Sequence, residues 1–564
     1  MKYTEQALET LQDRYYKQGD TSPQDLFYRI AFKFGSDTGH EERLFNYLND
    51  GWLSASTPIL ADSPLPISCF LPYVPDTVEG LLDNFVEKGH LSVSGGGIGT
   101  YFGHVRSQGE KSTGIIPHLK VADSQVQAYQ QGSTRRGSEA VYVDITHPEI
   151  VEFIGLRTPT GGDANRKCLN LHHGVNISDD FMKKVLEAYE GKDPEYELID
   201  PKRGGTGKFL KVKDVWEKLM QTRAATGEPY IAFIDTINKT LPEEQQRAGL
   251  KVHHSNLCSE ITLPTDRHRT AVCCLSSLNL AYYDDWKSDT VFIRDVVEFL
   301  DNVLEYFIDN APDAMSKAVY SAQQERAIGI GALGFHTLLQ KREVPWESAL
   351  AKGLNMEIFK HIKSEALLAS KLLGEKRGAA PDMEFTGLRN SHLLAVAPNA
   401  SSSIIMGVSP SIEPYKSNAY VHKTLSGSHL VKNPQLEKLL EKKGENNEKT
   451  WKSIITKGGS VQHLSFLDEW ERDVYKTANE ISMQWVIEFA GDRQQYICQS
   501  QSLNLFVPFG VDASRFSRLH VVAWQKGVKT LYYVRSEAAR KAENLNDKVE
   551  RVYLDDSACL ACEG

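Results

Sequence analysis

The sequence predicts an α/β fold, because strand-like and helical segments alternate along almost the whole chain. From about residue 53 to about residue 534, short apolar segments typical of strands are followed by segments with helical periodicity, and no long linker intervenes. The 564 residues are 41% apolar and 24% charged, which is ordinary globular composition. Length alone allows three or four domains, but one large α/β barrel could absorb most of the chain.

The predicted elements follow one another in a simple order. Residues 1–50 show helical periodicity and predict a short helical region. Residues 53–176 are broken by Gly, Ser, Thr and Pro, as expected for strands and functional loops. Helical patterns return over 178–250, and two strand-like runs, SNLCSEITLPT and AVCCLSSLNLAYY, follow within 252–282. The later charge-rich block KLLEKKGENNEKTWK predicts a solvated surface loop.

Charge and hydropathy exclude several classes of function. The chain has 64 Lys and Arg residues against 74 Asp and Glu residues, and its net charge of −10 argues against a general nucleic-acid or membrane surface. The N-terminus lacks the basic-then-apolar pattern of a signal peptide, and no apolar run approaches about 18 residues. We therefore expect a soluble, cytoplasmic protein with neither a membrane nor nucleic acid as its partner.

Cys258 lies in the segment SNLCSEI between an amide and a carboxylate. If the segment is extended, its side chains alternate with period two, so Asn256, Cys258 and Glu260 would share one strand face. A thiol, a general base and a hydrogen-bond donor would then meet in one small volume. Taken alone the trio is a weak signal, because a buried cysteine in a strand is more often a small apolar residue.

The other cysteines do not form a local metal site or a disulfide scaffold, for which eight cysteines are too few. Cys69 lies far upstream of Cys273, and the adjacent Cys273 and Cys274 would point to opposite faces of a strand. Cys559 and Cys562 end a tail with few apolar anchors. A CxxC pair can be a redox dithiol, half of a zinc site or a coincidence. On a mobile tail its natural role is exchange with a buried disulfide.

Several loops have the composition of anion-binding sites. The glycine-rich segment 94–99 would let backbone N–H groups approach an anionic ligand, although a tight turn needs the same residues. Residues 397–403, APNASSS, and the turn 54–58 are rich in hydroxyl and N–H donors, which either bind phosphate or cap a helix. The loop 132–138 holds two arginines between glycines and suits a nucleotide clamp or a solvated loop.

The ordered set of motifs STPIL, SCFL, SGGGIG, SNLCSEITLP, AVCCLSSLNL, RAIGIGALG, APNASSS, SIEP, QSQSLNLF, TLYY and CLAC resembles one family, the catalytic large subunit of class I ribonucleoside-diphosphate reductases. The resemblance runs from about residue 50 to the C-terminus. It implies a ten-stranded α/β barrel over residues 51–540, made of two five-stranded parallel halves antiparallel to each other, with a finger loop that carries Cys258 into the centre. A short helical region, 1–50, would precede the barrel, and a flexible redox tail, 541–564, would follow it.

The resemblance also implies a radical mechanism. Cys258 would be oxidised to a thiyl radical and would abstract the 3′-hydrogen of the ribose. Cys69 and Cys273 would reduce the 2′-carbon while forming a disulfide, Glu260 would act as base at the 3′-hydroxyl, and Asn256 would hydrogen-bond the sugar. Radicals of this kind are held where water and side reactions are excluded. The remaining Cys168, Cys274 and Cys498 match no role, and we expect them to pack as small apolar residues.

Further positions follow from the same resemblance. Tyr532 and Tyr533, although adjacent tyrosines are common in strands, match a stacked pair that relays the oxidising equivalent from a separate small subunit. The substrate would be bound by Thr57, Ser68, Gly97, Asn399, Ala400, Ser401, Ser402 and Ser403.

Asp76, Arg106, Arg135 and Ser133 match positions that bind a deoxynucleoside triphosphate or ATP as the effector that selects the substrate base. The chain departs from the usual pattern at Ser133, Thr134 and Arg136, so the effector rules do not carry over. Only about fifty residues precede STPIL, so we expect no N-terminal ATP-cone and no shut-off by dATP.

The implied partners are the small subunit with its metal cofactor, thioredoxin or glutaredoxin, a second copy of the chain as a homodimer, and Mg²⁺ with the nucleotides. No metal is expected in this chain. Two alternatives stay open: an adenosylcobalamin-dependent reductase, against which Tyr532 and Tyr533 argue, and a non-catalytic nucleotide-binding relative.

Overall fold

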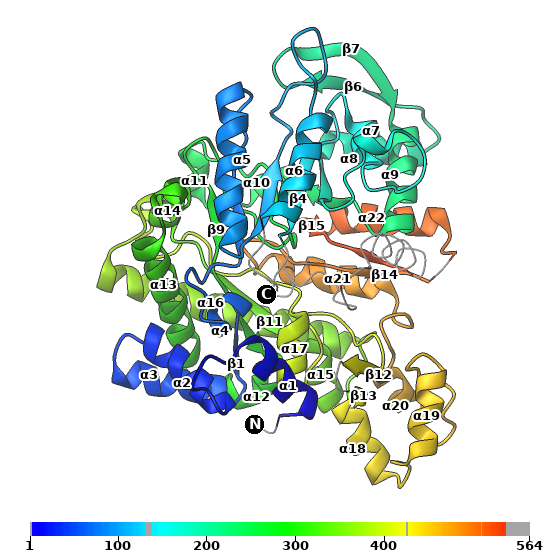
Figure 1. Cartoon of the computed structure of the whole chain (residues 1–564). Coiled ribbons are helices and arrows are strands. Elements are labelled where there is room, and N and C mark those ends of the chain that lie inside the picture. Colours follow the sequence, from blue (N-terminus) through cyan, green and yellow to red (C-terminus); the bar gives the residue numbers. More distant parts are fainter. Residues whose placement is uncertain (1–2, 130–136, 425–426, 509, 537–564) are drawn as a thin grey trace.

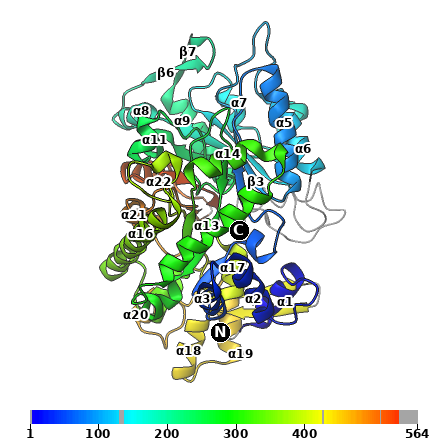
Figure 2. The ribbon, with the colours of Figure 1, turned by 90° about the vertical axis from the view of Figure 1, so that its left-hand side faces the viewer.

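The fold is seen in a computed structural model of the chain, which describes residues 3–129, 137–424, 427–508 and 510–536 (Figure 1). Helices surround a central set of strands, and the first three helices lie together at one end of the molecule (Figure 1). Turned by 90°, the same strands remain enclosed by helices (Figure 2).

The first half of the barrel is a regular parallel sheet. Its five strands are ordered β8-β5-β4-β3-β2, and every neighbouring pair is parallel. Parallel strands need crossover connections, and helices supply most of them. The strands are β2 (Cys69–Leu71), β3 (Gly97–Tyr101), β4 (Glu139–Asp144), β5 (His172–Ile177) and β8 (Tyr230–Phe233), and the main helices between them are α5 (Val78–Val93), α6 (Ile116–Ala128), α8 (Asp179–Tyr189) and α9 (Val212–Thr226).

The second half consists of shorter, broken strands. β10 pairs in parallel with β11, isolated parallel bridges join Ile330 to Leu394 and Val396 to Gln501, and β14 pairs in parallel with β16. These strands are β9 (Ala271–Cys273), β10 (Leu275–Asn279), β11 (Gly329–Leu333), β14 (Leu505–Phe506), β15 (Thr530–Leu531) and β16 (Val534–Arg535). Long helices, α13 (Phe292–Asn310) and α16 (Ala349–Arg377), pack against each other beside this half.

The two halves join at both edges. β9 is antiparallel to β2, and β15 is antiparallel to β8. The pairings therefore close on themselves, and the predicted barrel of two antiparallel halves is confirmed. We call the end at which β2, β3, β5 and β8 begin the near mouth, and the end at which β3, β4 and β5 finish the far mouth.

The predicted helical N-terminal region is also confirmed. It consists of α1 (Glu5–Arg14), α2 (Pro23–Phe34) and α3 (Thr38–Asn49). Ser22 and Asp25 form a capping box at the start of α2, with Pro23 at the first helical position, so the local sequence specifies where this helix begins. The chain then enters β1 (Leu53–Ala55), which pairs with β10 and ties the helices to the barrel.

Two local predictions are wrong. Residues 251–264 contain no strand, so the strand-face argument for Asn256, Cys258 and Glu260 fails and a loop is found, as the family resemblance implied. The charge-rich block forms the end of α18 (Pro434–Lys442) and most of α19 (Glu448–Thr456), because Leu436, Leu440, Trp451 and Ile454 build a small core of their own. Helical amphipathicity there outweighs the high charge.

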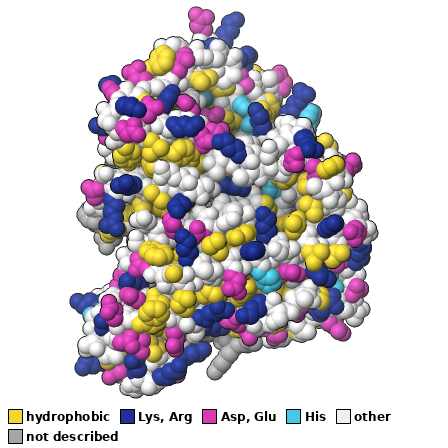
Figure 3. All heavy atoms as spheres, turned by 180° about the vertical axis from the view of Figure 1, so that it is seen from behind, with side chains coloured by type: hydrophobic (Ala, Val, Ile, Leu, Met, Phe, Trp, Pro, Cys, Tyr) yellow, Lys and Arg dark blue, Asp and Glu magenta, His cyan; other side chains and the backbone are white. Residues whose placement is uncertain are grey.

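The outer surface is mixed in character. On the face shown in Figure 3, basic and acidic side chains are interspersed and apolar side chains are scattered among them. Within the described ranges, no helix is both long enough and apolar enough to cross a membrane.

Candidate active site

Glycines in β3 clear a path for the loop 251–264 through the barrel. A Cβ atom on Gly99 would lie 2.4 Å from the backbone oxygen of Ser255 and 2.7 Å from Cα of Asn256. A Cβ atom on Gly97 would lie 2.8 Å from the side chain of Leu257 and 3.4 Å from Sγ of Cys69. These glycines were expected to make room for an anionic ligand; at Gly97 and Gly99 the room is taken by the loop itself.

Cys258 lies near the tip of this loop and is 3% exposed. The next residue, Ser259, has a φ of 66°, so the chain reverses in the left-handed region. Cys258 belongs to a buried cluster that includes Tyr142, Tyr532 and Tyr533. The thiol is therefore enclosed in a water-poor, largely aromatic environment.

Side chains of the barrel, rather than a β-ladder, satisfy the backbone of the loop tip. Ser502 Oγ donates to the carbonyl of Cys258 at 2.6 Å, and Thr530 Oγ1 donates to that of Ser259 at 2.7 Å. The hydroxyl of Tyr142 donates to the carbonyl of Asn256 at 2.8 Å. Sequence reasoning missed Ser502, Thr530 and Tyr142, because nothing in their local sequence marks a contact with residues more than a hundred positions away.

Asn256 and Glu260 do lie near Cys258, although not on a strand face. The amide Nδ2 of Asn256 donates to Sγ of Cys69 at 3.3 Å, and its Oδ1 accepts from the backbone N–H of Ile261. Glu260 is 1% exposed, and Ser502 Oγ lies 3.2 Å from its Oε2. Burial raises the pKa of Glu260 to about 7, with hydrogen bonds from Asn256 and Ser502 opposing the rise. Such a carboxyl can exchange a proton near neutral pH.

Cys69 and Cys273 occupy directly opposite positions on two strands. In the antiparallel pair of β2 with β9, the Cα of Cys69 is the partner of the Cα of Cys273. Directly opposite residues have Cβ atoms roughly 4.5–5.5 Å apart, close to the separation that a disulfide requires. The backbone register therefore suits two thiols that exchange a bond.

Three of the remaining cysteines pack in or against the apolar core, as predicted. Cys168 and Cys274 are buried in the main apolar core, and burial raises the pKa of the Cys168 thiol to about 12. Cys498 packs against the same core and accepts hydrogen bonds from backbone N–H groups of Leu393 and Leu394. Cys559 and Cys562 lie outside the described residues.

The predicted phosphate loop begins the short helix α17 (Ala400–Met406) at the near mouth. Asn399 adopts a φ of 56°, and its side chain is engaged: Oδ1 accepts from Ser277 and Nδ2 donates to the carbonyl of Ala332. Both N–H groups of its amide are used by backbone carbonyls, so Asn399 would donate to a ligand through its backbone N–H. Ser401 and Ser402 are buried, and Ser403 Oγ donates to the carbonyl of Ala400.

The first helix reaches into this loop, which the sequence did not predict. Arg14, the last residue of α1, donates to Oγ of Ser401 at 3.2 Å. The hydroxyls of Tyr15 and Thr57 lie 3.2 Å apart. A guanidinium and a phenol thus join the hydroxyl-rich segments near α17. The helical pattern of residues 5–14 carries no signal of this role.

Several hydroxyls near the site are buried without a partner among the described residues. Ser68 is 4% exposed, precedes Cys69 and has an unsatisfied hydroxyl. An unsatisfied buried hydroxyl costs free energy unless a ligand or water pairs with it. The hydroxyls of Ser54, Ser56 and Ser276 are also buried without a hydrogen-bond partner among the described residues.

Tyr532 and Tyr533 connect β15 to β16 and are in contact. Their ring centroids are 4.3 Å apart with an interplanar angle of 55°, so the rings are tilted and not stacked as expected. Tyr230 contacts both rings, with centroid distances of 4.8 Å to Tyr532 and 5.1 Å to Tyr533. The three phenols and Cys258 belong to one buried cluster.

The predicted effector residues are only partly described. Asp76, between β2 and α5, and Arg106, after β3, form an ion pair with 2.8 Å between Arg106 Nε and Asp76 Oδ2. Both are partly exposed. Ser133 and Arg135 lie outside the described residues.

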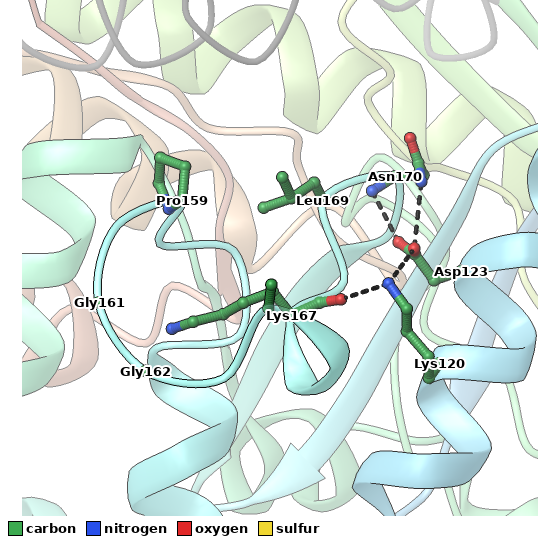
Figure 4. A pocket seen from close by; sticks show the side chains of 9 residues that line it. Lys120, Asp123, Pro159, Gly161, Gly162, Lys167, Leu169 and Asn170 are labelled. Carbon is green, nitrogen blue, oxygen red and sulfur yellow. Dashed lines mark hydrogen bonds and ion pairs between the residues drawn. The ribbon is translucent and has the colours of Figure 1, made fainter. Parts of the chain in front are cut away.

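Two cavities lie away from these residues. One, of about 210 Å³, lies between α6 and the loop 159–170, where Lys120 donates to the carbonyl of Lys167 and Asp123 accepts from Asn170 (Figure 4). The other, of about 330 Å³, lies at the far mouth; its lining includes Tyr101, His104, Asp144, Asn176, Lys251 and His253. Among the described residues, no group of three or more His, Cys, Asp or Glu side chains is arranged to hold a metal ion.

Known proteins share this architecture over nearly the full chain. A family model described as "Ribonucleotide reductase, barrel domain" matches residues 67–386 and 379–534, and one described as "Ribonucleotide reductase, all-alpha domain" matches residues 1–66. The ribonucleoside-diphosphate reductase large subunit of Invertebrate iridescent virus 3 is 44% identical over 617 residues, covering 99% of this chain and 98% of its own.

Two further relatives agree. A protein of Frog virus 3 (isolate Goorha), whose name assigns it to the same subunit, is 47% identical over 96% of this chain and 95% of its own. The solved class Id ribonucleotide reductase alpha subunit of Actinobacillus ureae superimposes with a TM-score of 0.84 at 34% identity, covering 96% of this chain and 98% of that one. The barrel encloses a cysteine-bearing loop and has two cysteines at opposite positions on neighbouring strands. Together with matches of this extent, these features show that the chain belongs to the family of ribonucleoside-diphosphate reductase large subunits.

Proposed function

We propose that this large subunit reduces ribonucleoside diphosphates by a thiyl-radical mechanism centred on Cys258. The observation that carries the proposal is the position of Cys258 at the tip of a buried loop. Tyr532 and Tyr533 belong to the same buried cluster as Cys258, and Asn256 links the loop to Cys69. An enclosed thiol in one cluster with a phenol pair, on a loop that contacts a second thiol-bearing residue, suits a radical that must be protected from water.

The proposed reaction uses the three cysteines in two roles. The Cys258 thiyl takes the 3′-hydrogen atom of the ribose, which leaves a carbon radical. One thiol of the Cys69 and Cys273 pair protonates the departing 2′-hydroxyl, which leaves as water. The pair then supplies two electrons and the new 2′-hydrogen and becomes a disulfide, and Cys258 returns its hydrogen atom to the 3′-carbon.

Glu260 and Asn256 would handle the sugar hydroxyls. With a pKa of about 7, Glu260 can take the 3′-hydroxyl proton and later return it. Asn256 contacts Cys69 through Nδ2, so it would hold the sugar between the two sets of thiols.

The substrate diphosphate, with Mg²⁺ as its counter-ion, would lie on residues 399–403. Backbone N–H groups at a helix start attract phosphate. Thr57 and the hydroxyl of Ser68, which has no partner among the described residues, would add hydrogen bonds, and Gly97, packed against Leu257 and Cys69, would line the site beside them. Arg14, whose guanidinium contacts Ser401, would add positive charge.

The oxidising equivalent would come from a separate small subunit that holds a metal cofactor, through Tyr533 and Tyr532. Contact between the two rings and their place in one cluster with Cys258 support this class I assignment. The disulfide of Cys69 and Cys273 would be reduced by Cys559 and Cys562, and these in turn by thioredoxin or glutaredoxin. Such recycling needs a reducing compartment, which makes the cytoplasm the proposed location.

The regulatory effector would bind near Asp76 and Arg106, with ATP or a deoxynucleoside triphosphate as ligand. Asp76 lies two residues before α5, and α5 exposes Val78, Leu82 and Val86 at helical spacing, each at 60% or more. An apolar stripe of this kind on a helix suits a second copy of the chain. We therefore propose a homodimer through this helix, next to the effector site.

A turnover assay with two matched cysteine variants tests the mechanism. With the small subunit and a dithiol present, C258S should abolish deoxynucleotide formation, whereas C274S, which alters a buried core cysteine, should retain it. Retained turnover in C258S would contradict the thiyl mechanism. Turnover supported by adenosylcobalamin without a small subunit would replace the class I assignment.

A further inference from the structure

A group of three charged or titratable side chains reaches the hydroxyl of Tyr533 through one of its members, His172. His172 begins β5, Glu228 precedes β8, and Arg157 follows α7 (Ile150–Ile154). Nδ1 of His172 lies 3.2 Å from the Tyr533 hydroxyl and 2.6 Å from Oε1 of Glu228. Arg157 NH1 lies 2.8 Å from the same carboxylate oxygen and 2.7 Å from Nδ1 of His172. We call Arg157, His172 and Glu228 the Tyr533 clamp.

The carboxylate of the clamp is ionised and fully occupied. The side chain of Glu228 is only 3% exposed, and Arg157 and His172 hold its pKa well below the usual range against the effect of burial. Its Oε2 accepts from the backbone N–H of His173 and lies 3.1 Å from Nδ1 of that ring. A carboxylate held by this many donors is a fixed anchor.

Glu228 and Arg157 together hold the ring of His172. Its Nδ1 lies 2.6 Å from the carboxylate oxygen of Glu228, which only accepts hydrogen bonds, and 2.7 Å from NH1 of Arg157, which only donates them. The hydroxyl of Tyr533 is a third neighbour of the same nitrogen, at 3.2 Å. Contact with a ring that is itself held by an ion pair restricts where the phenolic oxygen can lie.

The surrounding rings restrict Tyr533 further. Its ring meets Tyr230 at 89° and His172 at 83°, and the guanidinium of Arg535 lies 4.1 Å from its centroid. These contacts hold the ring plane but none of them acts on the hydroxyl. At the oxygen end, Nδ1 of His172 lies 3.2 Å from the hydroxyl.

We propose that His172, anchored by Glu228 and Arg157, is a positioning residue for Tyr533. It keeps the phenol in the orientation that touches Tyr532, with 4.3 Å between the ring centroids. This inference rests on the proposed relay through Tyr533 and adds no proton or electron step of its own. Without this contact, the position of the phenol is less restricted, and the contact with Tyr532 is made for a smaller share of the time.

Two substitutions separate the hydrogen bond from the packing. In H172N the side-chain amide takes the place of Nδ1 and keeps a hydrogen-bonding group there, whereas H172L fills the space and removes it. H172L should lower kcat by about 100-fold, the scale expected when a reacting group is misplaced by about 1 Å. H172N should stay much closer to the original kcat, and KM for the nucleoside diphosphate should not change in either variant.

A spectroscopic readout tests orientation directly. With 3-aminotyrosine in place of Tyr533, the radical formed with the small subunit should give one set of β-methylene hyperfine couplings in the parent chain and in H172N, and a broadened set in H172L. Equal couplings and equal kcat in H172L and the parent chain would overturn the proposal, as would a loss in H172N as large as in H172L.

The proposed function and this inference fail in different ways. If the parent chain with 3-aminotyrosine forms no radical there, the relay through Tyr533 is wrong. If the radical forms but its orientation is independent of His172, the relay stands and the positioning role is wrong. Melting curves of both variants establish that each is folded before either comparison is made.

Discussion

The near and far mouths of the barrel are lined by different chemistry. Cys69 and Gly97 lie at the near mouth, together with the hydroxyl-rich start of α17 and, at the starts of β5 and β8, the clamp around Tyr533. At the far mouth Tyr101, His104 and His253 are in mutual contact beside a cavity of about 330 Å³. The loop 251–264 joins the two, because Lys251 lines the far cavity and Cys258 lies inside the barrel.

Under the proposed mechanism, this difference separates groups that react from groups that support them. Burial lowers the pKa of His253 to about 4, so the imidazole of His253 is neutral at physiological pH. Around Cys258 the polar groups are thiols, an amide, hydroxyls, phenols and one carboxylate that titrates near neutrality, Glu260. The near mouth can therefore handle protons and hydrogen atoms, while the far mouth holds the stem of the loop.

The largest effect should come from Glu260. The raised pKa of about 7 means that the basic form exists above this pH and is lost as pH falls, so kcat/KM should drop about tenfold per pH unit below it. E260Q should cost roughly 10²- to 10⁴-fold in turnover and abolish this acidic limb. Steady-state rates between pH 5.5 and 8.5 measure both; an unchanged limb in E260Q would assign the titration to another group.

The second-largest effect should come from Gly99 of β3, which makes room for the loop 251–264. The Cβ of G99A would press on the backbone of Ser255 and Asn256, which cannot move aside without shifting the loop. We expect about 100-fold lower turnover and about 1–3 kcal/mol lower stability. G353A on α16, where a Cβ meets nothing within 4 Å, is the control and should raise stability by about 0.5–1 kcal/mol without a change in rate. Equal rates in both variants would remove the argument that β3 positions the loop.

The unsatisfied hydroxyl of Ser68 should have a smaller effect. If a substrate oxygen pairs with it, S68A loses one hydrogen bond worth about 1 kcal/mol and KM rises about fivefold at unchanged kcat. S364A removes a hydroxyl that bonds only the carbonyl of Lys360 on α16, and KM should not change. A KM for S68A equal to that for S364A would place the diphosphate away from Ser68.

The smallest effect should appear at the far mouth. H104F keeps an aromatic ring against Tyr101 and His253 and removes a buried Nδ1 that has no partner among the described residues. Turnover should change by less than about twofold, in keeping with the ~0.5 kcal/mol typical of substitutions that break no named interaction. A loss comparable to that of G99A would show that the far mouth controls the loop more strongly than its chemistry suggests.

The residues of the candidate site were largely predictable from the chain, but their arrangement was not. Cys258, Glu260 and Asn256 were selected correctly as neighbours, yet for the wrong reason, because period-two alternation was applied to a segment that forms a loop. Its backbone groups are satisfied by Ser502, Thr530 and Tyr142, from distant parts of the chain. Local propensity cannot report such long-range partners.

The glycines of β3 illustrate the same limit. Their composition indicated the approach of an anionic ligand or a tight turn, whereas at Gly97 and Gly99 the loop 251–264 occupies the room. Whether a phosphate or another part of the chain occupies it depends on which strand faces the loop. This is a property of barrel closure rather than of the six-residue motif.

The chain alone indicated an α/β protein with a helical start, and it predicted reactive cysteines in separate segments, a tyrosine pair and a phosphate-type helix start. These features are local, because each depends on residue type and on spacing of a few positions. The register that sets Cys69 opposite Cys273, the raised pKa of Glu260 and the clamp on Tyr533 arose only when both halves of the barrel closed. Burial, cross-strand register and side-chain contact join residues far apart in the chain, so they are properties of the folded molecule.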